Sequence, residues 1–537
     1  SSRGIPVSEN IRFAVQEKEY YQVPAIQSPH PVFNWEMDTS VKAITAVRVL
    51  VASTEEMLQS GQGDYWDSRK IPVKDCRLVY KGKVLKPRQL YYWKVQIWND
   101  KDIVSNFSGV STFYFAPDTG KKTFTHYPLA AEIQKAEHIQ QQGPTRYFID
   151  FGKDGFAQLY LHLNSNRSDS IWVEAAEALS GPGTILKSNG NIRYLRIGIY
   201  VEKGTHDYAI TWPVNEKRNK RNPALMPGYI GEVFPFRYVV IENYDGQMDS
   251  RTIQRKLIHY PFDETASAFS SSDTVLNQVW ELCRYSMKAT SFTGYYVDGD
   301  RERLPYEADA LINQLSHYSV DAEYSIARRS MEYLLFHPTW PTEWSLQNIM
   351  LAWNDYMYTG DDTYLKEFYP ELQKKILMPL AGPNGLISTR ARKQEADFLE
   401  SIHMVKDFDG KHGLKDNVDW PQKGDYIGAE KEYGGETDGF VYTDYNAVVN
   451  AYYYHVLGLM QKIAKVLDKS ADAERYQKEA EKVYRSFQLV FKDKTSGLYK
   501  DGDTTLHRSL HANMFALAFG LVPEKDIPVV VRFIKTR

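Results

Sequence analysis

The stretch Tyr295–Asp309 reads Y-Y-V-D-G-D-R-E-R-L-P-Y-E-A-D and places five carboxylates and two arginines in one short segment. Apolar residues at i, i+3, i+4 and i+7 then predict a helix: Ala308, Leu311, Ile312 and Leu315. Pro305 suits a first helical position, where its missing N–H costs nothing. The stretch is therefore a loop that enters a helix.

This loop has residue types suited to acid catalysis. Asp298, Asp300 and Glu302 stand close enough in the chain to repel one another, so at least one should hold its proton unusually well. Arg301 and Arg303 can keep the other carboxylates ionised. A proton donor beside ionised carboxylates is what cleavage of a glycosidic bond requires. The alternative is an acidic helix N-terminus without chemistry, because the helix dipole stabilises negative charge there.

Composition argues against several classes of protein. With 65 Lys plus Arg against 68 Asp plus Glu in 537 residues, no net field draws the chain to nucleic acid or an acidic membrane face. The two cysteines, Cys76 and Cys283, cannot build a disulfide framework or a thiolate metal site. No run approaches the ~18 apolar residues of a membrane span. We expect a secreted or periplasmic protein whose leader has been removed, with a cytoplasmic location as the alternative.

The beginning of the chain predicts strands. Ala46–Ala52 and Tyr91–Trp98 are rich in β-branched and aromatic residues and partly alternate between apolar and polar. We expect residues 1–117 to form an immunoglobulin- or fibronectin-like β-sandwich. Its predicted core tryptophans are Trp35, Trp93 and Trp98.

Strand patterns resume after a polar connection. Ala157–Leu163 and Phe236–Glu242 are two of the clearest runs, and they predict a second β-sandwich over residues 118–265. The first β-rich region carries no residues for chemistry. In the second, Gly181-Pro182-Gly183 is predicted to be a turn and not a phosphate loop, because no Lys-Ser/Thr follows it and no helix pattern begins there.

From Ser272-Asp273 onward the apolar period changes to that of helices, behind a Ser/Asp cap. Helical stripes then follow one another, separated by turn signals such as Thr359–Asp362. Successive helical hairpins predict an (α/α)6-type barrel over residues 266–537. The apolar run Ile527–Ile534 continues towards Arg537, so we expect the barrel to be incomplete at the C-terminus.

Several stretches carry a resemblance to a known family. The most specific is Glu302–Asp309, E-R-L-P-Y-E-A-D, which is similar to a family motif E-R-L-G-W-x-x-D that follows an Asp-Cys-Pro-type segment. Further similar stretches occur along most of the chain: Phe33–Trp35, Tyr92–Val95, Phe234–Glu242, Phe269–Trp280, Trp353–Pro370 and Ala512–Pro523. The chain thus resembles the bacterial α-L-rhamnosidases of glycoside hydrolase family 78.

The resemblance implies an inverting, exo-acting hydrolase that removes terminal α-L-rhamnose from a carbohydrate substrate without a cofactor. Carried over by position, Glu302 is the general acid and Asp309 binds sugar hydroxyls. The family's preceding aspartate has two candidates, Asp298 and Asp300, because the spacing to Glu302 is shorter here.

The aromatic sugar platform departs from the family pattern. Tyr306 replaces the family's tryptophan and Pro305 its glycine, which puts the finer substrate preference in question. Trp344 and Trp420 match aromatic positions near the family's cleft less specifically, and a place in the core is the alternative for each.

The general base is the least determined part of the site. An inverting enzyme needs a second carboxylate ~6.5–9.5 Å from the acid, with room for the attacking water. The resemblance implies a glutamate late in the barrel, which we expect beyond Arg537. The alternatives within the chain are Glu343, Asp419 and Asp425.

Metal chemistry is not expected. His317, His337 and His455 stand singly within or at the end of predicted helices, without the paired spacing of a metal site. Two other functions stay open at this point. One is a carbohydrate-binding protein that has lost catalysis, and the other is an (α/α)-barrel enzyme acting on a different sugar.

Overall fold

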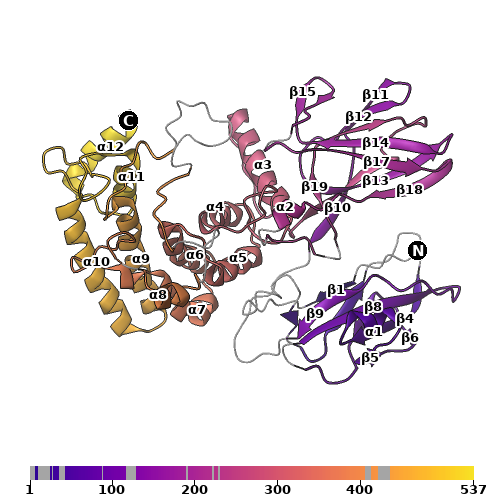
Figure 1. Ribbon diagram of the computed structural model, residues 1–537, viewed down its shortest axis with the longest axis horizontal. Helices are drawn as coiled ribbons and strands as arrows, with labels where there is room; N and C mark the ends of the chain where they lie inside the picture. The colour runs from indigo at the N-terminus through magenta and orange to yellow at the C-terminus, as the bar shows by residue number, and fades with distance from the viewer. Residues whose placement is uncertain are drawn as a thin grey trace. The chain divides into compact units, whose positions relative to one another are not determined.

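The computed structural model describes residues 6–9, 25–26, 28–35, 43–86, 89–115, 129–188, 191–219, 223–227, 230–392, 394–404, 413–420 and 436–537. The chain, drawn in Figure 1, divides into two compact units. The first comprises Ser1–Pro305 with Ser316–Arg329, and the second comprises Tyr306–Leu315 with Ser330–Arg537. All the sheets belong to the first unit.

The first unit begins with two sheets, one of three strands in the order β1–β3–β7 and one of six strands. Their strands are β1 (Pro6–Glu9), β2 (Ala25–Ile26), β3 (Val32–Trp35), β4 (Ile44–Ala52), β5 (Trp66–Asp67), β6 (Ile71–Pro72), β7 (Arg77–Val79), β8 (Gln89–Asn99) and β9 (Ser111–Phe115). Side chains from both sheets meet in one core, among them Phe33, Trp35 and Trp93. A short helix, α1 (Glu55–Gln59), begins at the cap Thr54.

Strand β8 shows why one predicted core residue is wrong. Trp93, Val95 and Ile97 are buried, because alternate residues of a strand face the same side of the sheet. Trp98 lies on the other face, and Lys70 Nζ lies 5.0 Å from the centre of its ring. Its position in the strand, rather than its hydrophobicity, decides that it is only partly buried.

Two further sheets of five strands each share a second core in the first unit. One sheet contains β10 (Ala130–Lys135), β13 (Phe156–Ser165), β18 (Gly204–Ile210), β19 (Phe234–Pro235) and β21 (Ile253–His259). The other contains β11 (His138–Gly143), β12 (Arg146–Asp150), β14 (Asp169–Ala176), β17 (Tyr194–Val201) and β20 (Tyr238–Glu242). Inward residues alternate along both, as Leu159, Leu161 and Leu163 do on β13. A small hairpin, β15 (Leu179–Gly181) with β16 (Thr184–Ile185), completes the β structure.

Helix α3 (Thr274–Ala289) begins where the period of the sequence changes. Asp273 caps it by accepting the backbone N–H groups of Val275 and Leu276, which confirms the predicted acidic cap. Apolar residues at helical spacing near its start are exposed, however, with Val275 at 62% and Leu276 at 51%. The helical period was therefore correct, although it does not mark a buried face here.

The second unit contains most of the long helices. Their bounds, together with those of the helices shared with the first unit, are α4 (Glu307–Tyr318), α5 (Ser325–Phe336), α6 (Thr342–Thr359), α7 (Thr363–Lys375), α8 (Ala396–Ser401), α9 (Ala447–Val466), α10 (Ser470–Val490), α11 (Leu510–Ala518) and α12 (Ile527–Thr536). Helix α6 packs against α7 and α9, and α9 packs against α10 and α11 (Figure 1). Gly360 ends α6 in the left-handed conformation, with φ of 67°, at the turn predicted from Thr359–Asp362.

Two predictions about α4 are wrong in detail. The Tyr306 carbonyl accepts the Ala310 N–H at 2.8 Å, so the helix begins at Glu307 and Pro305 precedes it. The buried face includes Glu307, Ala310 and Gln314, whereas Ile312 is 66% exposed. Polar side chains occupy this buried face because they have partners there, as Gln314 Nε2 donates to the Leu351 carbonyl at 3.0 Å.

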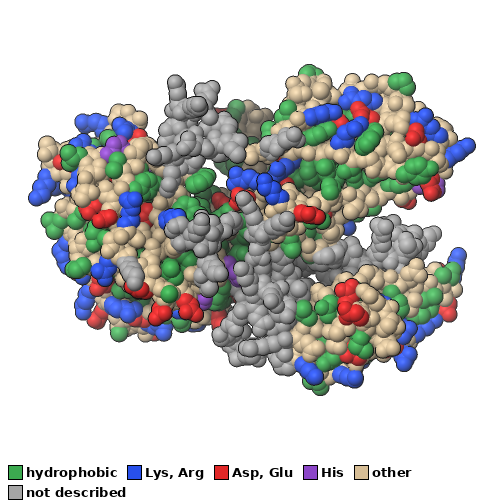
Figure 2. Space-filling model, in the orientation of Figure 1, with side chains coloured by type: hydrophobic (Ala, Val, Ile, Leu, Met, Phe, Trp, Pro, Cys, Tyr) green, Lys and Arg blue, Asp and Glu red, His purple; other side chains and the backbone are tan. Residues whose placement is uncertain are grey.

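Charged side chains of both signs are interspersed over the face shown in Figure 2, in keeping with the nearly balanced totals of the sequence. Among the described residues, no helix is both long and apolar enough to cross a membrane.

Candidate active site

The loop that carries Glu302 closes on itself. The Asp298 N–H donates to the Leu304 carbonyl at 3.1 Å, and the Arg303 N–H donates to the Gly299 carbonyl at 3.0 Å. Gly299 has φ of 100°, and Arg303 has φ of 53°, a region that non-glycine residues rarely adopt. These two left-handed residues bracket Glu302 closely and fix the local course of the backbone. We call residues 298–304 the acid loop.

Glu302 and Asp298 both contact one arginine on this loop. Arg301 Nε lies 3.6 Å from Glu302 Oε1, and Arg301 Nη2 lies 3.5 Å from Asp298 Oδ2. The Glu302 side chain remains partly exposed, at 16%. A carboxyl group at the surface of a fixed loop, beside a second carboxylate, can both reach a substrate and exchange its proton with water.

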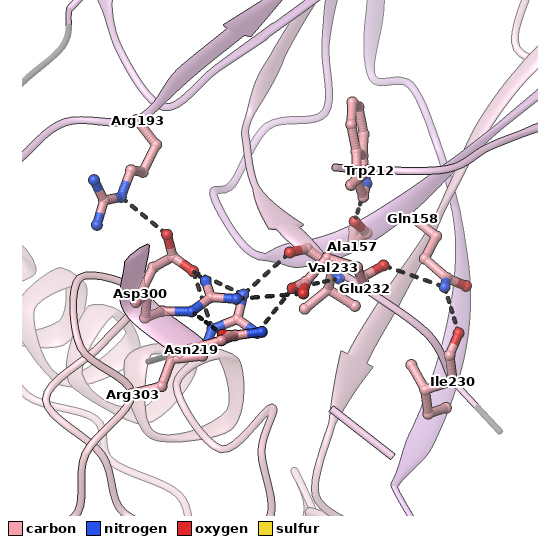
Figure 3. Close-up of polar contacts among 11 residues, drawn as sticks. Ala157, Gln158, Arg193, Trp212, Asn219, Ile230, Glu232, Val233, Asp300 and Arg303 are labelled. Carbon is pink, nitrogen blue, oxygen red and sulfur yellow. Dashed lines mark hydrogen bonds and ion pairs between the residues drawn. The ribbon is translucent and has the colours of Figure 1, made fainter. Parts of the chain in front are cut away.

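Asp300 belongs to a different environment, shown in Figure 3. Its Oδ1 accepts Arg303 Nη2 at 2.7 Å and Arg218 Nη1 at 3.0 Å. Its Oδ2 lies 3.0 Å from Arg193 Nε. Both oxygens of Asp300 are thus engaged by guanidinium groups, which suits a structural role better than binding of a sugar hydroxyl.

In the second unit, three predicted aromatic residues and Trp340 form one connected cluster of rings. The ring centre of Trp340 lies 6.5 Å from that of Trp344 and 6.5 Å from that of Trp420. Tyr306 meets Trp344 edge to face at 5.7 Å. Sequence reasoning missed Trp340, and the signal that could have found it is its place in the run W-P-T-E-W from Trp340 to Trp344.

A short backbone pairing joins the two aromatic segments. The Thr342 N–H donates to the Lys415 carbonyl at 2.9 Å, and the Lys415 N–H donates to the Trp340 carbonyl at 3.0 Å. The backbone around Lys415 therefore runs beside the start of α6. This pairing explains how residues so distant in sequence form one aromatic cluster.

Glu343, one of the alternative bases, is buried at the start of α6. Its Oε1 accepts the Val418 N–H at 2.8 Å, and its Oε2 accepts the Asn417 N–H at 3.3 Å. Burial and then the charge of Asp416 raise the pKa of Glu343 to about 8. A general base must meet a water, whereas this carboxyl, 2% exposed, holds the backbone of the neighbouring segment.

Asp416 is partly buried and close enough to Glu343 for its charge to act on that carboxyl. Its Oδ1 accepts the hydroxyls of Thr342 at 2.8 Å and Thr389 at 3.0 Å. Burial raises the pKa of Asp416 despite these hydrogen bonds. Asp416 is therefore a structural partner of this segment rather than an exposed base.

Asp419 has the exposure that Glu343 lacks. Its side chain is 48% exposed, and its Oδ2 lies 2.9 Å from Nε2 of the buried His511. Burial raises the pKa of Asp419, but hydrogen bonds from His511 and from the Trp420 N–H outweigh this effect and lower it. Sequence reasoning missed His511, since nothing in the local sequence links it to Asp419. The third alternative, Asp425, lies outside the described residues.

The predicted site residues fall into two groups, one in each unit. Asp298, Asp300 and Glu302 are on the acid loop of the first unit. The others belong to the second unit: Tyr306, Asp309, Trp344 and Trp420. Asp309 is the third residue of α4, partly buried, and close in the chain to Tyr306.

The three histidines singled out in the sequence have ordinary partners. Tyr296 Oη and His317 Nδ1 are 2.8 Å apart, and His337 Nδ1 lies 3.0 Å from the Tyr333 carbonyl. His455 stacks on Phe519 at 4.3 Å. In the described parts of the chain, no group of three or more His, Cys, Asp or Glu residues is placed to hold a metal ion.

Two known family models match this chain. The model of the bacterial alpha-L-rhamnosidase six-hairpin glycosidase domain matches residues 264–535, about half of the chain. The chain belongs to the bacterial α-L-rhamnosidase family. The Rha78A-like N-terminal immunoglobulin domain matches residues 15–117, which identifies the first sheets as an immunoglobulin-like domain. The suspected family is thereby confirmed, as is the order of an Ig-like domain before a helical glycosidase domain.

Individual relatives agree with this family. An α-L-rhamnosidase of Formosa agariphila is 37% identical over 87 residues, which is 16% of this chain and 9% of that relative. One from Streptomyces avermitilis is 34% identical over 105 residues, or 19% of this chain and 10% of that relative. The matched region thus spans only about a tenth of the length of these curated relatives.

Solved structures of rhamnosidases share the fold. The α-L-rhamnosidase from Dictyoglumus thermophilum aligns with a TM-score of 0.53 at 15% identity, covering 98% of this chain and 77% of that one. The Klebsiella oxytoca rhamnosidase with rhamnose bound aligns with a TM-score of 0.54 at 11% identity, covering 76% and 80%. At these identities the likeness supports the fold alone.

Proposed function

We propose that this protein is an exo-acting, inverting α-L-rhamnosidase that removes terminal α-L-rhamnose from glycosides or polysaccharides. The observation that carries the proposal is Glu302, a partly exposed carboxyl group on a closed loop within the motif E-R-L-P-Y-E-A-D of the family domain. In this reaction Glu302 donates its proton to the glycosidic oxygen as the bond to the aglycone breaks.

The environments of Asp298 and Asp300 support the sugar-binding roles that we propose. Asp298 is the aspartate that binds a sugar hydroxyl near Glu302, since both oxygens of Asp300 are engaged by arginines. Asp309 supplies a second hydroxyl contact. The aromatic cluster of Tyr306, Trp340, Trp344 and Trp420 offers flat apolar faces to the rhamnose ring and to the aglycone.

The base must be an ionised carboxylate that can polarise a water. Of the alternatives considered in the sequence, Asp419 has this state and exposure, because His511 and a backbone N–H lower its pKa. Glu343 has neither. We therefore rank Asp419 above Glu343 as a base within this chain.

The finer architecture belongs to the same proposal. We propose a second β-sandwich over residues 118–265, between the Ig-like domain of residues 1–117 and an (α/α)6-type barrel from residue 266. The substrate is a carbohydrate that bears terminal rhamnose, and a secreted or periplasmic location fits the use of such a polymer.

The test compares substrates that differ in their need for protonation. The full-length protein and its Glu302→Gln variant are assayed on an aryl α-L-rhamnoside with a good leaving group and on an alkyl rhamnoside. We expect turnover of the alkyl rhamnoside to fall by about a hundredfold or more, and that of the aryl rhamnoside to fall less. Equal losses on both would refute Glu302 as the acid.

Proton NMR of the first-formed sugar tests the stereochemical outcome. An inverting enzyme releases β-L-rhamnose, which then equilibrates with the α anomer. Release of the α anomer first would contradict inversion. Binding of rhamnose without hydrolysis of either substrate would favour the carbohydrate-binding alternative.

A further inference from the structure

The acid loop is tied to a second carboxylate from another part of the first unit. Glu232 Oε1 lies 2.8 Å from Arg303 Nη1 (Figure 3). Glu232 Oε2 lies 3.3 Å from Arg218 Nη2. Asp300 accepts the same two guanidinium groups. Glu232 and Asp300 therefore bridge Arg218 and Arg303 from two sides. We call Arg193, Arg218, Glu232, Asp300 and Arg303 the arginine clamp.

Most of the clamp comes from the region of the second pair of sheets. Arg193 directly precedes β17, Arg218 lies on the short helix α2 (Glu216–Asn219), and Glu232 directly precedes Val233 and β19. The backbone reinforces these ion pairs, because Arg303 Nη2 donates to the Val233 carbonyl at 3.2 Å. The Ala224 N–H also donates to the Arg303 carbonyl at 2.8 Å.

Two of the guanidinium groups in the clamp are buried, so their charges must be compensated. Arg303 is 1% exposed and Arg218 is 5% exposed. A buried guanidinium is tolerated only where carboxylates and carbonyl oxygens compensate its charge. Arg218 and Arg303 share the two carboxylates of Glu232 and Asp300, so the loss of either carboxylate leaves two buried guanidinium groups with only one shared carboxylate.

Arg303 links this charge balance to Glu302. It follows Glu302 directly and has φ of 53°, a left-handed conformation that a residue with a side chain keeps only when its surroundings hold it. If the clamp opens, Arg303 can return to an ordinary conformation. The peptide after Glu302 then rotates, and the direction of the acid changes.

We propose that Glu232 and Arg218 are positioning residues for the general acid, and that they act through Arg303. The sheet region that supplies them thus helps to position the general acid. This inference rests on the proposed role of Glu302.

A misdirected acid has a kinetic signature that partial unfolding lacks. Misplacement of Glu302 slows cleavage of a poor leaving group more than that of a good one, because only the former depends on protonation. Loss of folded protein lowers both rates by the same factor. The ratio of the two rates therefore separates a positioning role from a merely structural one.

The test substitution is Glu232→Gln in the full-length protein. Its matched control is Glu242→Gln, since Glu242 also meets two arginines, Arg146 at 3.3 Å and Arg196 at 3.1 Å, away from the acid loop. We expect Glu232→Gln to lower kcat on an alkyl rhamnoside at least tenfold more than kcat on an aryl rhamnoside. Glu242→Gln should leave this ratio within about twofold of the parent's.

Variants of Arg218 give a second series. Arg218→Met removes the bridge between the two carboxylates, and Arg218→Lys restores a charge without the planar fork. The ratio should shift strongly for Arg218→Met and less for Arg218→Lys. Equal losses on both substrates in the Glu232 and Arg218 variants, or no loss at all, would overturn the proposal.

Hydrogen exchange provides a readout that does not depend on activity. The amides of Asp298 and Arg303 donate within the acid loop, so both should exchange slowly in the parent and in Glu242→Gln. They should exchange at least tenfold faster in Glu232→Gln. A parent inactive on every rhamnoside would sink the proposed function, whereas unchanged exchange in Glu232→Gln would sink the clamp alone.

Discussion

Two turns that adopt the left-handed conformation lie beside predicted site residues, and they are held in different ways. Arg303, with φ of 53°, follows Glu302, and Val418, with φ of 68°, precedes Asp419. Ion pairs hold the side chain of Arg303. A hydrogen bond from its own N–H to the buried carboxyl of Glu343 holds Val418.

The two turns also differ in the groups that their carboxylates meet. Asp300 meets guanidinium groups, each of which carries a full positive charge. Glu343 and Asp416 meet backbone N–H groups and threonine hydroxyls instead. Such neutral donors satisfy the oxygens without cancelling the charge, and burial raises the pKa of both groups.

The largest expected effect on stability comes from breaking the ion pairs that hold the turn at Arg303. Arg303→Met leaves Asp300 and Glu232 without one shared cation, and it should lower the free energy of unfolding by about 3–5 kcal/mol. Urea denaturation of the purified protein measures this change. Arg301→Met is the control, because Arg301 is 57% exposed and its loss should matter by less than about 1 kcal/mol. Equal effects of the two substitutions would show that the clamp adds no stability.

The carboxyl group of Glu343, which holds the turn at Val418, should make the free energy of unfolding depend on pH. The pKa of Glu343 is raised to about 8 from an unfolded value of about 4.3, so its protonated form stabilises the folded state. That stability is full below pH ~4.3 and is lost as the pH rises towards ~8.

Glu343→Gln removes this titration, so its free energy of unfolding should rise by about 4 kcal/mol relative to the parent's between pH 5 and pH 9. The free energy of unfolding, measured across that range, tests the sign. Glu481→Gln, at an exposed carboxylate of α10, should show no such trend. If the free energy of unfolding of Glu343→Gln instead rose relative to the parent's as the pH was lowered, Glu343 would be ionised in the folded protein.

A smaller effect is expected from the hydroxyl donors. Thr342→Val keeps the shape of the side chain but removes the hydrogen bond to Asp416 Oδ1, and should cost about 1–2 kcal/mol. Thr389→Val removes the second hydroxyl from the same oxygen. The double variant should deviate from additivity by at least about 0.5 kcal/mol, whereas simple addition would mean that the two hydroxyls act independently.

The smallest expected effect on stability concerns the left-handed backbone of Val418. Val418→Gly and Val418→Ala both lose the buried side chain, so their difference isolates the cost of the left-handed backbone. The glycine variant should be the more stable by about 1 kcal/mol. At Lys478, on an exposed face of α10, alanine should be better than glycine by a similar amount. Thermal unfolding of the four variants decides, and a preference for alanine at both positions would argue against strain at Val418.

Much of the candidate site was predictable because the motif is local. Glu302, Arg301 and Asp298 lie within five positions, and the closed loop keeps them together. The sequence also singled out Tyr306, Trp344 and Trp420, although it did not indicate that Trp340 contacts both Trp344 and Trp420. The choice between Asp298 and Asp300 could not be made, because spacing alone treats two nearby carboxylates as equivalent.

The sequence by itself determined the periods of the secondary structure and several of its boundaries. The cap at Asp273 and the left-handed Gly360 depend only on neighbouring backbone groups, so local residue types specify them. The exposed stripe of α3 and the outward Trp98 show the limit of this information, since a period gives the element and not its neighbours.

The tertiary structure decided which groups each carboxylate meets and which carboxylates are buried or exposed. Asp300 meets Arg218 across 82 positions, Glu343 meets Val418 across 75, and Asp419 meets His511 across 92. The charge and proton affinity of a carboxyl group depend on the groups within a few ångströms of it. Folding brings those groups together from distant parts of the chain, and for this reason only the folded structure separates the residues that hold the site from those that can act in it.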